Sequence, residues 1–514
     1  MIFGLTRRAR FRKILFLACA LFLITADGLG QRYEFTPACE KAYRSVLLFR
    51  FTEAGALLAK EKAADPGNLV PVYIENYIDF LIMFTGEDKG YFDQAKDRRE
   101  KRLSLLAKGD KSSPYYRFCL ADVNIQWALA RVKFREFTAA GLELKRANDL
   151  IRENQALHPD FIPGQLGLGI MHALSGVVPE SYKWLANLIG FEGDIEQGVE
   201  EMTRVVNYRG SDRFTNSLRV PACIITALIQ ANLRNDPVAA LDMIGRFDQD
   251  PDLVSYGASP LAIYARTSIC LKTGHNEMAL EALESRRDEP GVYPLPFLDY
   301  LKGVALLNNL DPLAAGSFRV FLSEFTGSNY IKAAWQKVAW ASLVSGDTAD
   351  YRKHIRLALT QGTREVDEDK QAYAEASSGL MPNVSLLRAR LLSDGGYYNR
   401  ALDLLLNRSL KEYIRNKRDL AEYYYRLGRI YQALNQEARA LQNYRMAVLT
   451  GKTLPAYYAA GAALQMGIIY EREEEFASAD SCFRVCLSLD YEEYKTSLSQ
   501  KARAGLNRVR PGLR

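Results

Sequence analysis

The stretch AEYYYRLGRIYQALNQEARALQNYRMAVLT, residues 421–450, decides which fold to expect from this chain. Small and aromatic residues recur in it at the spacing of two helices packed side by side; they are Tyr424, Leu427, Gly428, Tyr431, Ala440, Tyr444 and Ala447. Two helix backbones approach closely only where side chains are small, so Gly428 is expected to face Ala440 across a helix hairpin. Tyr431 and Tyr444 are then expected to fill the space to the next hairpin.

A second copy follows at matching offsets and contains Met466, Gly467, Tyr470, Ala479, Phe483 and Cys486. Gly428 and Gly467 lie 39 residues apart, slightly more than the roughly 34 residues of a tetratricopeptide repeat. Two neighbouring copies in register predict this repeat type. The expected repeat-packing residues are therefore Gly428, Tyr431, Ala440, Tyr444, Gly467, Tyr470, Ala479 and Phe483.

Weaker copies recur towards the N-terminus, in residues 51–68, 262–284, 300–324, 335–347 and 385–406. Gly303 and Ala315, like Ala389 and Ala401, are twelve residues apart, as Gly428 and Ala440 are. No run of clean period-two alternation indicates a strand. We therefore expect an all-α fold, a tetratricopeptide-type superhelix (solenoid) of helix hairpins between residues 36 and 510. Residues 361–385 are loosely patterned and are interpreted as a longer, mobile connector.

A glycine-rich insert interrupts the hairpins at residues 161–198, which read FIPGQLGLGIMHALSGVVPESYKWLANLIGFEGDIEQG. Gly167 and Gly169 lack a Cβ and are expected to let a helix pass very close to a neighbour. Pro179 suits the first turn of a following helix, where a missing N–H costs nothing. Asp194, with Gln197 three residues later, has the pattern of a capping box at the start of the next helix.

This insert resembles one known family. The glycine-rich helix, the Ser175…Pro179 turn, the end at residues 188–191 and the start at Gly193-Asp194…Gly198 are similar to the eukaryotic inclusion-body-clearance family, which includes animal tetratricopeptide repeat protein 39. The resemblance spans roughly residues 33–202 and, more loosely, the C-terminal repeats. It implies a helical-repeat protein that binds other proteins, without a shared catalytic motif; fungal members are linked to lipid droplets and to clearance of aggregates.

The N-terminus has the three parts of a secretory signal. Basic residues at positions 7–13 precede the apolar run 14–26, and small residues follow at Gly28 and Gly30. The apolar run is shorter than the roughly 20 residues that span a bilayer. We expect export by a cleavable signal peptide over residues 1–30, to the periplasm or envelope, where the family's cytosolic members do not work. Cleavage after Gly30 is favoured over cleavage after Ala26 and leaves Gln31 as the first residue. The mature chain then comprises a helical-repeat region at 31–210, which includes the insert 161–198, and a tetratricopeptide array at 211–514.

The charge balance argues against nucleic acid as a partner. The whole chain has a formal charge of +6, but without residues 1–30 it has 62 basic and 60 acidic side chains. A body this close to neutrality provides no field that attracts a polyanion. Hydrophobic residues make up 48% and charged residues 25%, as in an ordinary soluble globular protein.

No pattern for catalysis, a cofactor or a metal stands out. Residues 164–169, GQLGLG, lack the Gly-Lys-Ser/Thr ending of a phosphate loop, and no strand precedes them. Only four histidines occur, and there is neither a His-Glu-x-x-His nor a Cys-x-x-Cys sequence. His172 is interpreted as a satisfied core histidine rather than a catalytic one. Cys482 and Cys486, at i and i+4, are interpreted as small apolar residues of a repeat core rather than as a thiol pair.

Two features of the sequence fit either helix packing or the binding of a partner. The 29 tyrosines suit a peptide-binding face as well as repeat packing; in the run 423–425, Tyr424 is expected to be the packed one. Trp184, Leu188 and Phe191 form an apolar stripe that either plugs the superhelix or contacts a partner or a lipid surface. The predicted function is an exported, non-enzymatic scaffold that binds a protein or peptide. The alternative is an envelope protein with peripheral membrane contact through residues 180–191.

Overall fold

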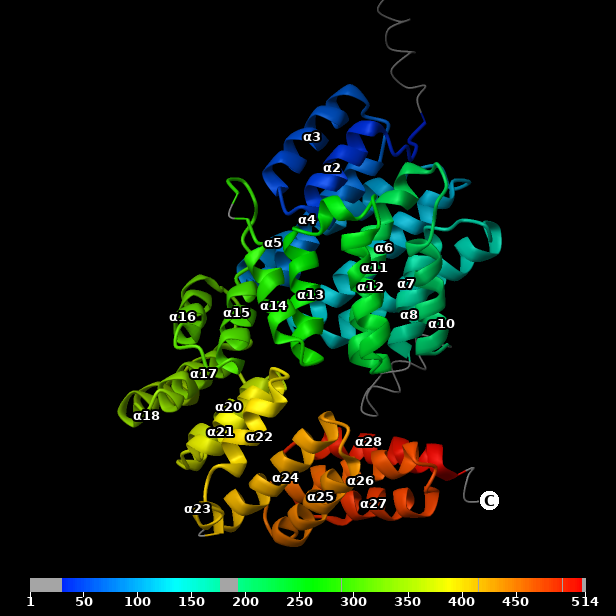
Figure 1. Ribbon diagram of the computed structural model, residues 1–514. Coiled ribbons are helices and arrows are strands. Elements are labelled where there is room, and N and C mark those ends of the chain that lie inside the picture. Colours follow the sequence, from blue (N-terminus) through cyan, green and yellow to red (C-terminus); the bar gives the residue numbers. More distant parts are fainter. Residues whose placement is uncertain (1–29, 176–192, 288, 415, 492, 511–514) are drawn as a thin grey trace, which may run out of the picture. The chain divides into compact units, whose positions relative to one another are not determined.

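The computed structural model describes residues 30–510 apart from 176–192, 288, 415 and 492. Figure 1 shows helices joined by loops and turns over these residues, and their only β-type pairing is an isolated bridge between Arg32 and Asn68. The all-α prediction is therefore confirmed. The chain divides into two compact units: unit 1 comprises residues 1–269 and 285–295, and unit 2 comprises residues 270–284 and 296–514.

The described residues of unit 1 form a series of helices. Its helices are α2 (Pro37–Leu47), α3 (Phe51–Ala64), α4 (Val70–Gly86), α5 (Lys89–Leu106), α6 (Pro114–Lys133), α7 (Phe137–Leu157), α8 (Gly164–Ser175), α10 (Ile195–Val206), α11 (Arg213–Ile229), the π-helix η2 (Gln230–Arg234), α12 (Pro237–Gln249), the 3-10 helix η3 (Val254–Tyr256) and α13 (Pro260–Lys272). The last three residues of α13 belong to unit 2.

Unit 2 continues the same construction. Its helices are α14 (Asn276–Glu284), α15 (Phe297–Asn308), α16 (Ala314–Glu324), α17 (Ile331–Val344), α18 (Thr348–Ile355), α19 (Leu357–Thr360), α20 (Asp367–Ser378), α21 (Val384–Asp394), α22 (Tyr398–Leu406), α23 (Lys411–Ile414), α24 (Lys417–Ala433), α25 (Glu437–Gly451), α26 (Tyr458–Arg472), α27 (Phe476–Ser488) and α28 (Lys495–Val509). Helices α24 to α28 pack one on the next in chain order (Figure 1).

Eight hairpin turns in the described chain have the same backbone conformation. One residue in each turn has a left-handed conformation with φ between 57° and 93°; these residues are Phe49, Arg135, Gly274, Leu310, Gly346, Gly396, Asn435 and Glu474. The amide after each of them donates to the carbonyl five residues earlier, at 2.8–2.9 Å, as from Gln436 to Tyr431. This is the Schellman ending, which satisfies the last carbonyls of a helix and reverses the chain.

These turns give the repeat period of unit 2. Gly274, Leu310 and Gly346 are 36 residues apart, and Gly396, Asn435 and Glu474 are 39 residues apart. The interval between Gly346 and Gly396 is 50 residues, because it contains the additional helices α19 and α20. The segment 361–385, expected to be a mobile connector, thus contains a helix. Glu375 on α20 accepts hydrogen bonds from Gln336 and Trp340 of α17, and these contacts hold α20 in place.

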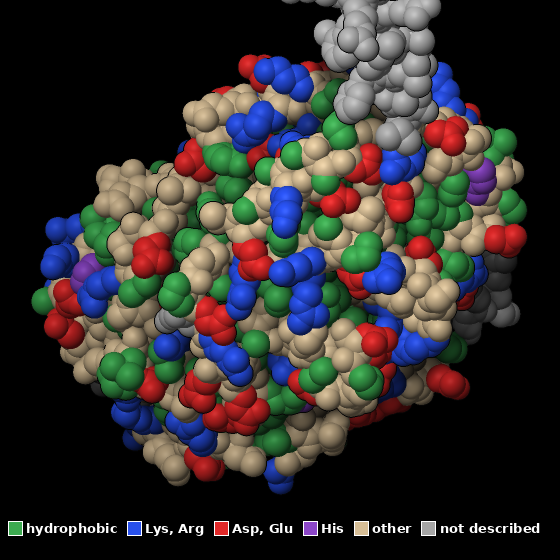
Figure 2. Space-filling model, turned by 90° about the horizontal axis from the view of Figure 1, so that it is seen from above, with side chains coloured by type: hydrophobic (Ala, Val, Ile, Leu, Met, Phe, Trp, Pro, Cys, Tyr) green, Lys and Arg blue, Asp and Glu red, His purple; other side chains and the backbone are tan. Residues whose placement is uncertain are grey.

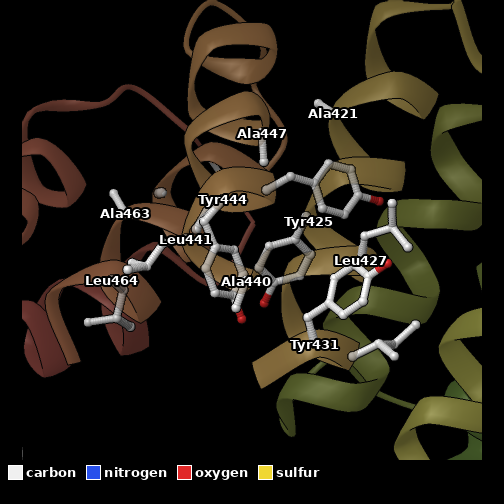
Figure 3. Packing of buried hydrophobic residues seen from close by; sticks show 14 of the residues in the cluster. Ala421, Tyr425, Leu427, Tyr431, Ala440, Leu441, Tyr444, Ala447, Ala463 and Leu464 are labelled. Atoms are coloured by element: carbon white, nitrogen blue, oxygen red, sulfur yellow. The ribbon is translucent and has the colours of Figure 1, made fainter. Parts of the chain in front are cut away.

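Within a hairpin, a glycine on the first helix lies under an aromatic ring of the second. A Cβ added to Gly428 would lie 2.5 Å from the Tyr444 ring, and one on Gly467 would lie 2.5 Å from the Phe483 ring. The expectation that Tyr444 fills the space between hairpins is therefore wrong: its ring lies inside its own hairpin (Figure 3), and the nearest atoms to Gly428 belong to this ring rather than to Ala440. A flat ring occupies the space that the missing side chain leaves.

The tyrosine run 423–425 differs from the expectation as well. Tyr423 and Tyr425 are buried, at 8% and 5% exposure, whereas Tyr424 is only partly buried. Tyr423 stacks on Tyr413 of α23, with ring centroids 4.6 Å apart, and Tyr425 meets Tyr458 of α26 at 5.8 Å. Helix α24 is covered on two sides, so the outer two tyrosines of the run are enclosed and the middle one is not.

In the described part of the insert, α8 and α10 cross at two glycines. A Cβ on Gly169 would lie 2.7 Å from the Gly198 carbonyl oxygen, so the predicted close approach is confirmed. Asp194 caps α10 by accepting from the Gln197 amide at 2.8 Å, but the Gln197 side chain donates to Glu201 instead of closing the capping box. Among the described residues, no helix combines the length and the apolar content needed to cross a bilayer.

The boundary expected between residues 210 and 211 falls inside unit 1. Phe214, at the start of α11, lies among the rings of Phe35, Tyr73 and Phe118, with centroid distances of 4.9–6.1 Å. Because α11 completes the aromatic core of the N-terminal helices, it cannot begin a separate unit. The units divide between residues 269 and 296 instead.

Candidate functional site

The residues predicted to pack the repeats are enclosed within α24 to α27. Tyr431 and Tyr470 are 8% and 9% exposed, and Ala440, Tyr444, Ala479 and Phe483 are fully buried. Their positions give them a part in holding the hairpins together and leave no surface for a ligand. Trp184, Leu188 and Phe191, expected to contact a partner, lie outside the described residues.

A cavity of about 350 Å³ lies in unit 2, where α20 interrupts the repeat. Its walls come from α15, α17, α20 and α21, with Leu271 and Tyr494 contributed by segments far away in the sequence. Most of the lining residues are apolar or carry side-chain amides; they are Leu271, Val304, Leu307, Trp340 and Leu391, with Asn308, Gln336 and Gln371. Four charged residues complete the lining: Lys337, Glu368, Arg390 and Asp394.

Lys337 is the most unusual group in this cavity. Its ammonium lies 5.6 Å from the ring centroids of both Tyr300 and Trp340. It forms no ion pair and no hydrogen bond with any described residue. Burial lowers the pKa of Lys337 to about 8, and the carboxylates of Glu368 and Asp369 offset only part of this effect. The cavity therefore holds a cation whose charge is poorly compensated.

Arg390 places a second cation in the lining. Its guanidinium lies over Trp340, 5.0 Å from the ring centroid. Its nearest carboxylate is Asp394, whose Oδ2 is 3.6 Å from Nε and whose side chain is half exposed. By contrast Arg426, on α24, has a close carboxylate partner, because its Nε and Nη2 both donate to Glu422 Oε1 at 3.1 and 2.8 Å.

The wall that carries Trp340 is held rigidly by Glu375. The Trp340 indole, the Gln336 amide and the Tyr351 hydroxyl all donate to this carboxylate, at 2.7–3.0 Å. Burial raises the pKa of Glu375, and these three neutral donors compensate the charged form only in part. Tyr494 also donates to Gln371, so the segment before α28 is joined to α20 at the cavity. A ligand would meet a site that is already formed.

The other candidate sites give weaker support for ligand binding or catalysis. A cavity in unit 1, beside Asp122 and Asn154, has a volume of about 20 Å³, which is room for one water molecule. His172 contacts Glu201 at 2.7 Å through Nδ1. Cys482 and Cys486 are free thiols whose pKa is raised by burial to about 11. No group of three or more His, Cys, Asp or Glu side chains in the described ranges is placed to hold a metal ion.

Comparison with known proteins adds a fold-level likeness only. No protein-family model matches this chain, and no curated protein matches it. Among solved structures, it is similar to the crystal structure of the P58(IPK) tetratricopeptide domain, with 14% sequence identity over 82% of this chain and 96% of that chain, and a TM-score of 0.22. With a TM-score this low, neither the superhelical path nor a ligand of that domain can be assigned to this chain.

The cavity has no signature in the sequence, since its residues are spread from 271 to 494 and none of them forms a local motif. Two signals could have indicated it. Gln336 and Lys337 interrupt an otherwise apolar run of alanine, valine and tryptophan at residues 333–341, and residues 361–385 break the repeat period. On the face shown in Figure 2, basic and acidic side chains are interspersed, as expected for a nearly neutral body.

Proposed function

We propose that this protein is an exported helical-repeat scaffold that binds a segment of another protein in the cavity of unit 2, without catalysing a reaction. The observation that supports the proposal is the formed cavity of about 350 Å³ at the interruption of the repeat. Its volume lies at the lower end of the range, about 300–1,000 Å³, in which proteins bind ligands. Arrays of helix hairpins commonly bind other proteins.

The chemistry of the lining suits a polypeptide. Asn308, Gln336 and Gln371 provide amides, which can exchange hydrogen bonds with a peptide backbone. Trp340, Leu307 and Leu391 provide apolar area for a side chain. Binding therefore combines apolar burial with directional contacts, as at the centre of a protein interface.

Site-specific photo-crosslinking tests this proposal. A benzophenone amino acid is placed at Glu368, which is exposed and lines the cavity, and in a matched variant at Ala477, which is exposed on α27. We expect a discrete adduct with an envelope protein from position 368 and none from position 477. Adducts of equal yield from both positions, or none from 368, contradict the proposal.

The proposed export has a separate test. The N-terminal pattern of residues 1–30 supports it. In a cell fractionation we expect the protein in the envelope fraction, and N-terminal sequencing is expected to begin at Gln31. Recovery from the cytosol with Met1 in place rules the export out and leaves the binding proposal intact.

A further inference from the structure

Resting on the proposed function, we infer that the cavity of unit 2 takes a carboxylate of the bound partner, which pairs with the Lys337 amine beside Arg390. The partner is therefore recognised by an acidic side chain or by its free C-terminus. Either source presents the same planar monoanion to the cavity.

The first argument is the state of Lys337. Lys337 is half-buried, and an ammonium withdrawn from water in this way usually has a carboxylate or several acceptors around it. Lys337 has neither among the described residues, and its ammonium lies 5.6 Å from the centroids of two aromatic rings instead. On the same helix, Lys332 shows the ordinary solution: its Nζ donates to the carbonyls of Ala358 and Leu359, at 2.9 and 3.3 Å. A ligand can provide the carboxylate that Lys337 lacks among the described residues.

The second argument is the opening beside that amine. A cation that is merely packed has no room for a counter-ion, whereas Lys337 lines about 350 Å³ of free volume. Arg390 lines the same space, and its only carboxylate contact among described residues is the 3.6 Å approach of Asp394. The guanidinium also forms a hydrogen bond with Tyr494, and its remaining N–H groups are donors for one oxygen of a bound carboxylate.

The third argument selects a monoanion. The lining contains two cations, Lys337 and Arg390, and two acids, Glu368 and Asp394. Glu368 is exposed and Asp394 is half exposed, so water screens both more than it screens Lys337. A single negative charge compensates the poorly solvated amine. A dianion such as phosphate would face both acids with its second charge and is expected to bind more weakly.

Binding of this kind takes up protons. Glu368, Asp369 and Glu375 on α20 raise the pKa of the Lys337 amine, whereas Arg390 on α21 lowers it together with burial, which is the largest effect. A carboxylate beside the amine raises the pKa of Lys337 from about 8. Affinity is therefore expected to change little between about pH 5.5 and 7, where the ligand is a carboxylate and the lysine is protonated, and to decrease above about pH 8 as the free protein loses the lysine proton.

The test uses the full mature chain and small blocked probes. N-acetylglutamate N-methylamide carries a side-chain carboxylate, N-acetylalanine carries a terminal one, and N-acetylglutamine N-methylamide carries neither. Binding is followed by the ¹³C-labelled Lys337 side-chain resonance, assigned with Lys337→Arg, and by the fluorescence of Trp340. We expect saturable shifts with at least one carboxylate probe, and a response to the amide probe that is at least about tenfold weaker.

The variants provide matched controls. Lys337→Gln is expected to weaken carboxylate binding about tenfold, whereas Lys302→Gln, which removes an exposed lysine on α15, is expected to leave it unchanged. Lys337→Arg keeps the charge and is expected to retain binding. A response to N-acetylglutamate N-methylamide alone identifies a side-chain source, and a response to N-acetylalanine alone identifies a C-terminus.

Three results overturn the inference: no shift with either carboxylate probe, equal shifts with the amide probe, or tighter binding of inorganic phosphate. These titrations require no partner, so their failure is separate from failure of the proposed function. If crosslinking from position 368 captures a partner while the carboxylate probes cause no shift, the proposed scaffold function is retained. Only the inferred recognition of a carboxylate is then contradicted.

Discussion

Asp122, on α6, has a partly buried carboxylate that makes the stability of unit 1 depend on pH. It accepts from Tyr73 at 2.7 Å and from Gln126 at 2.6 Å, both neutral donors. Burial raises the pKa of Asp122 from 3.8 to about 6. Because protonation is favoured in the folded state, protonated Asp122 contributes to the free energy of unfolding below about pH 4. This contribution is lost as pH rises from about 4 to 6.

Asp122→Asn removes this ionisation while keeping an acceptor for Tyr73. We expect the variant to be more stable than the parent at pH 7, by at most about 3 kcal/mol, and equally stable below pH 4. Urea unfolding of both proteins between pH 3.5 and 7.5 measures the difference. A gain that does not change with pH contradicts the assignment of the pKa to this carboxylate.

Gly428 tests the ring-over-glycine contact within a hairpin. Its added Cβ would lie 2.5 Å from the Tyr444 ring, which is itself fully buried. Gly428→Ala is expected to cost about 1–3 kcal/mol by overpacking. Gly55→Ala, also on a helix but with open space at its Cβ, is expected to be neutral or stabilising. Thermal unfolding by circular dichroism compares the two; equal midpoints would contradict the contact.

Among the elements, the hairpins were predictable and their turns were not. Small residues twelve positions apart indicate a hairpin because the two helices are adjacent in the chain, so the pattern is local. In the turns, Phe49, Arg135 and Glu474 adopt the left-handed conformation without the glycine that normally signals it. The Schellman hydrogen bond and the packing of both helices impose this conformation, and neither is visible in the turn residue itself.

Gly346 tests the turn, because a Cβ at this position would meet nothing within 4 Å and only its φ of 93° disfavours a side chain. Gly346→Ala is expected to destabilise by about 1–2 kcal/mol. Gly316→Ala, in α16 with the same open space, is expected to lie between no change and a gain of about 1 kcal/mol. Chemical denaturation measures both. Similar effects from the two variants contradict the argument from φ.

The cavity shows why the site escaped prediction while the fold did not. Lys337 and Arg390 lie in helices α17 and α21 outside any local motif, and Tyr494 lies more than 100 residues further along the chain than either of them. What brings them together is the additional helix α20, in a segment whose weak pattern indicated only a connector. A repeat period is readable from sequence, but the side chains that an interruption exposes depend on tertiary packing.

At the scale of the whole molecule, the chain passes between the two units more than once. After α14, residues 285–295 return to unit 1. The amide of Tyr293 donates to the Phe49 carbonyl at 2.7 Å, Glu289 pairs with Arg50, and the Tyr293 ring lies 5.1 Å from that of Phe51. The turn between α2 and α3 is thus covered by a segment 240 residues further along.

Tyr293→Ala removes the aromatic part of this cover. We expect faster hydrogen exchange in α2 and α3, with a loss of about 1–2 kcal/mol in local stability. Exchange in residues 296–510 is expected to be unchanged. Hydrogen-exchange mass spectrometry of the intact protein measures both regions; acceleration confined to unit 2, or none at all, contradicts the contact.

Residues 285–295, which return to unit 1, also affect the order in which the two units fold during synthesis. A nascent chain emerges from the ribosome in order, and domains generally fold as they emerge. Unit 1 lacks residues 285–295, which cover the turn between α2 and α3, until residue 295 has been synthesised. By then α14, an element of unit 2, has already been made. The first unit is therefore not completed before the second has begun. A ribosome that stalls before residue 285 releases a fragment whose N-terminal hairpin is left with its aromatic edge in water.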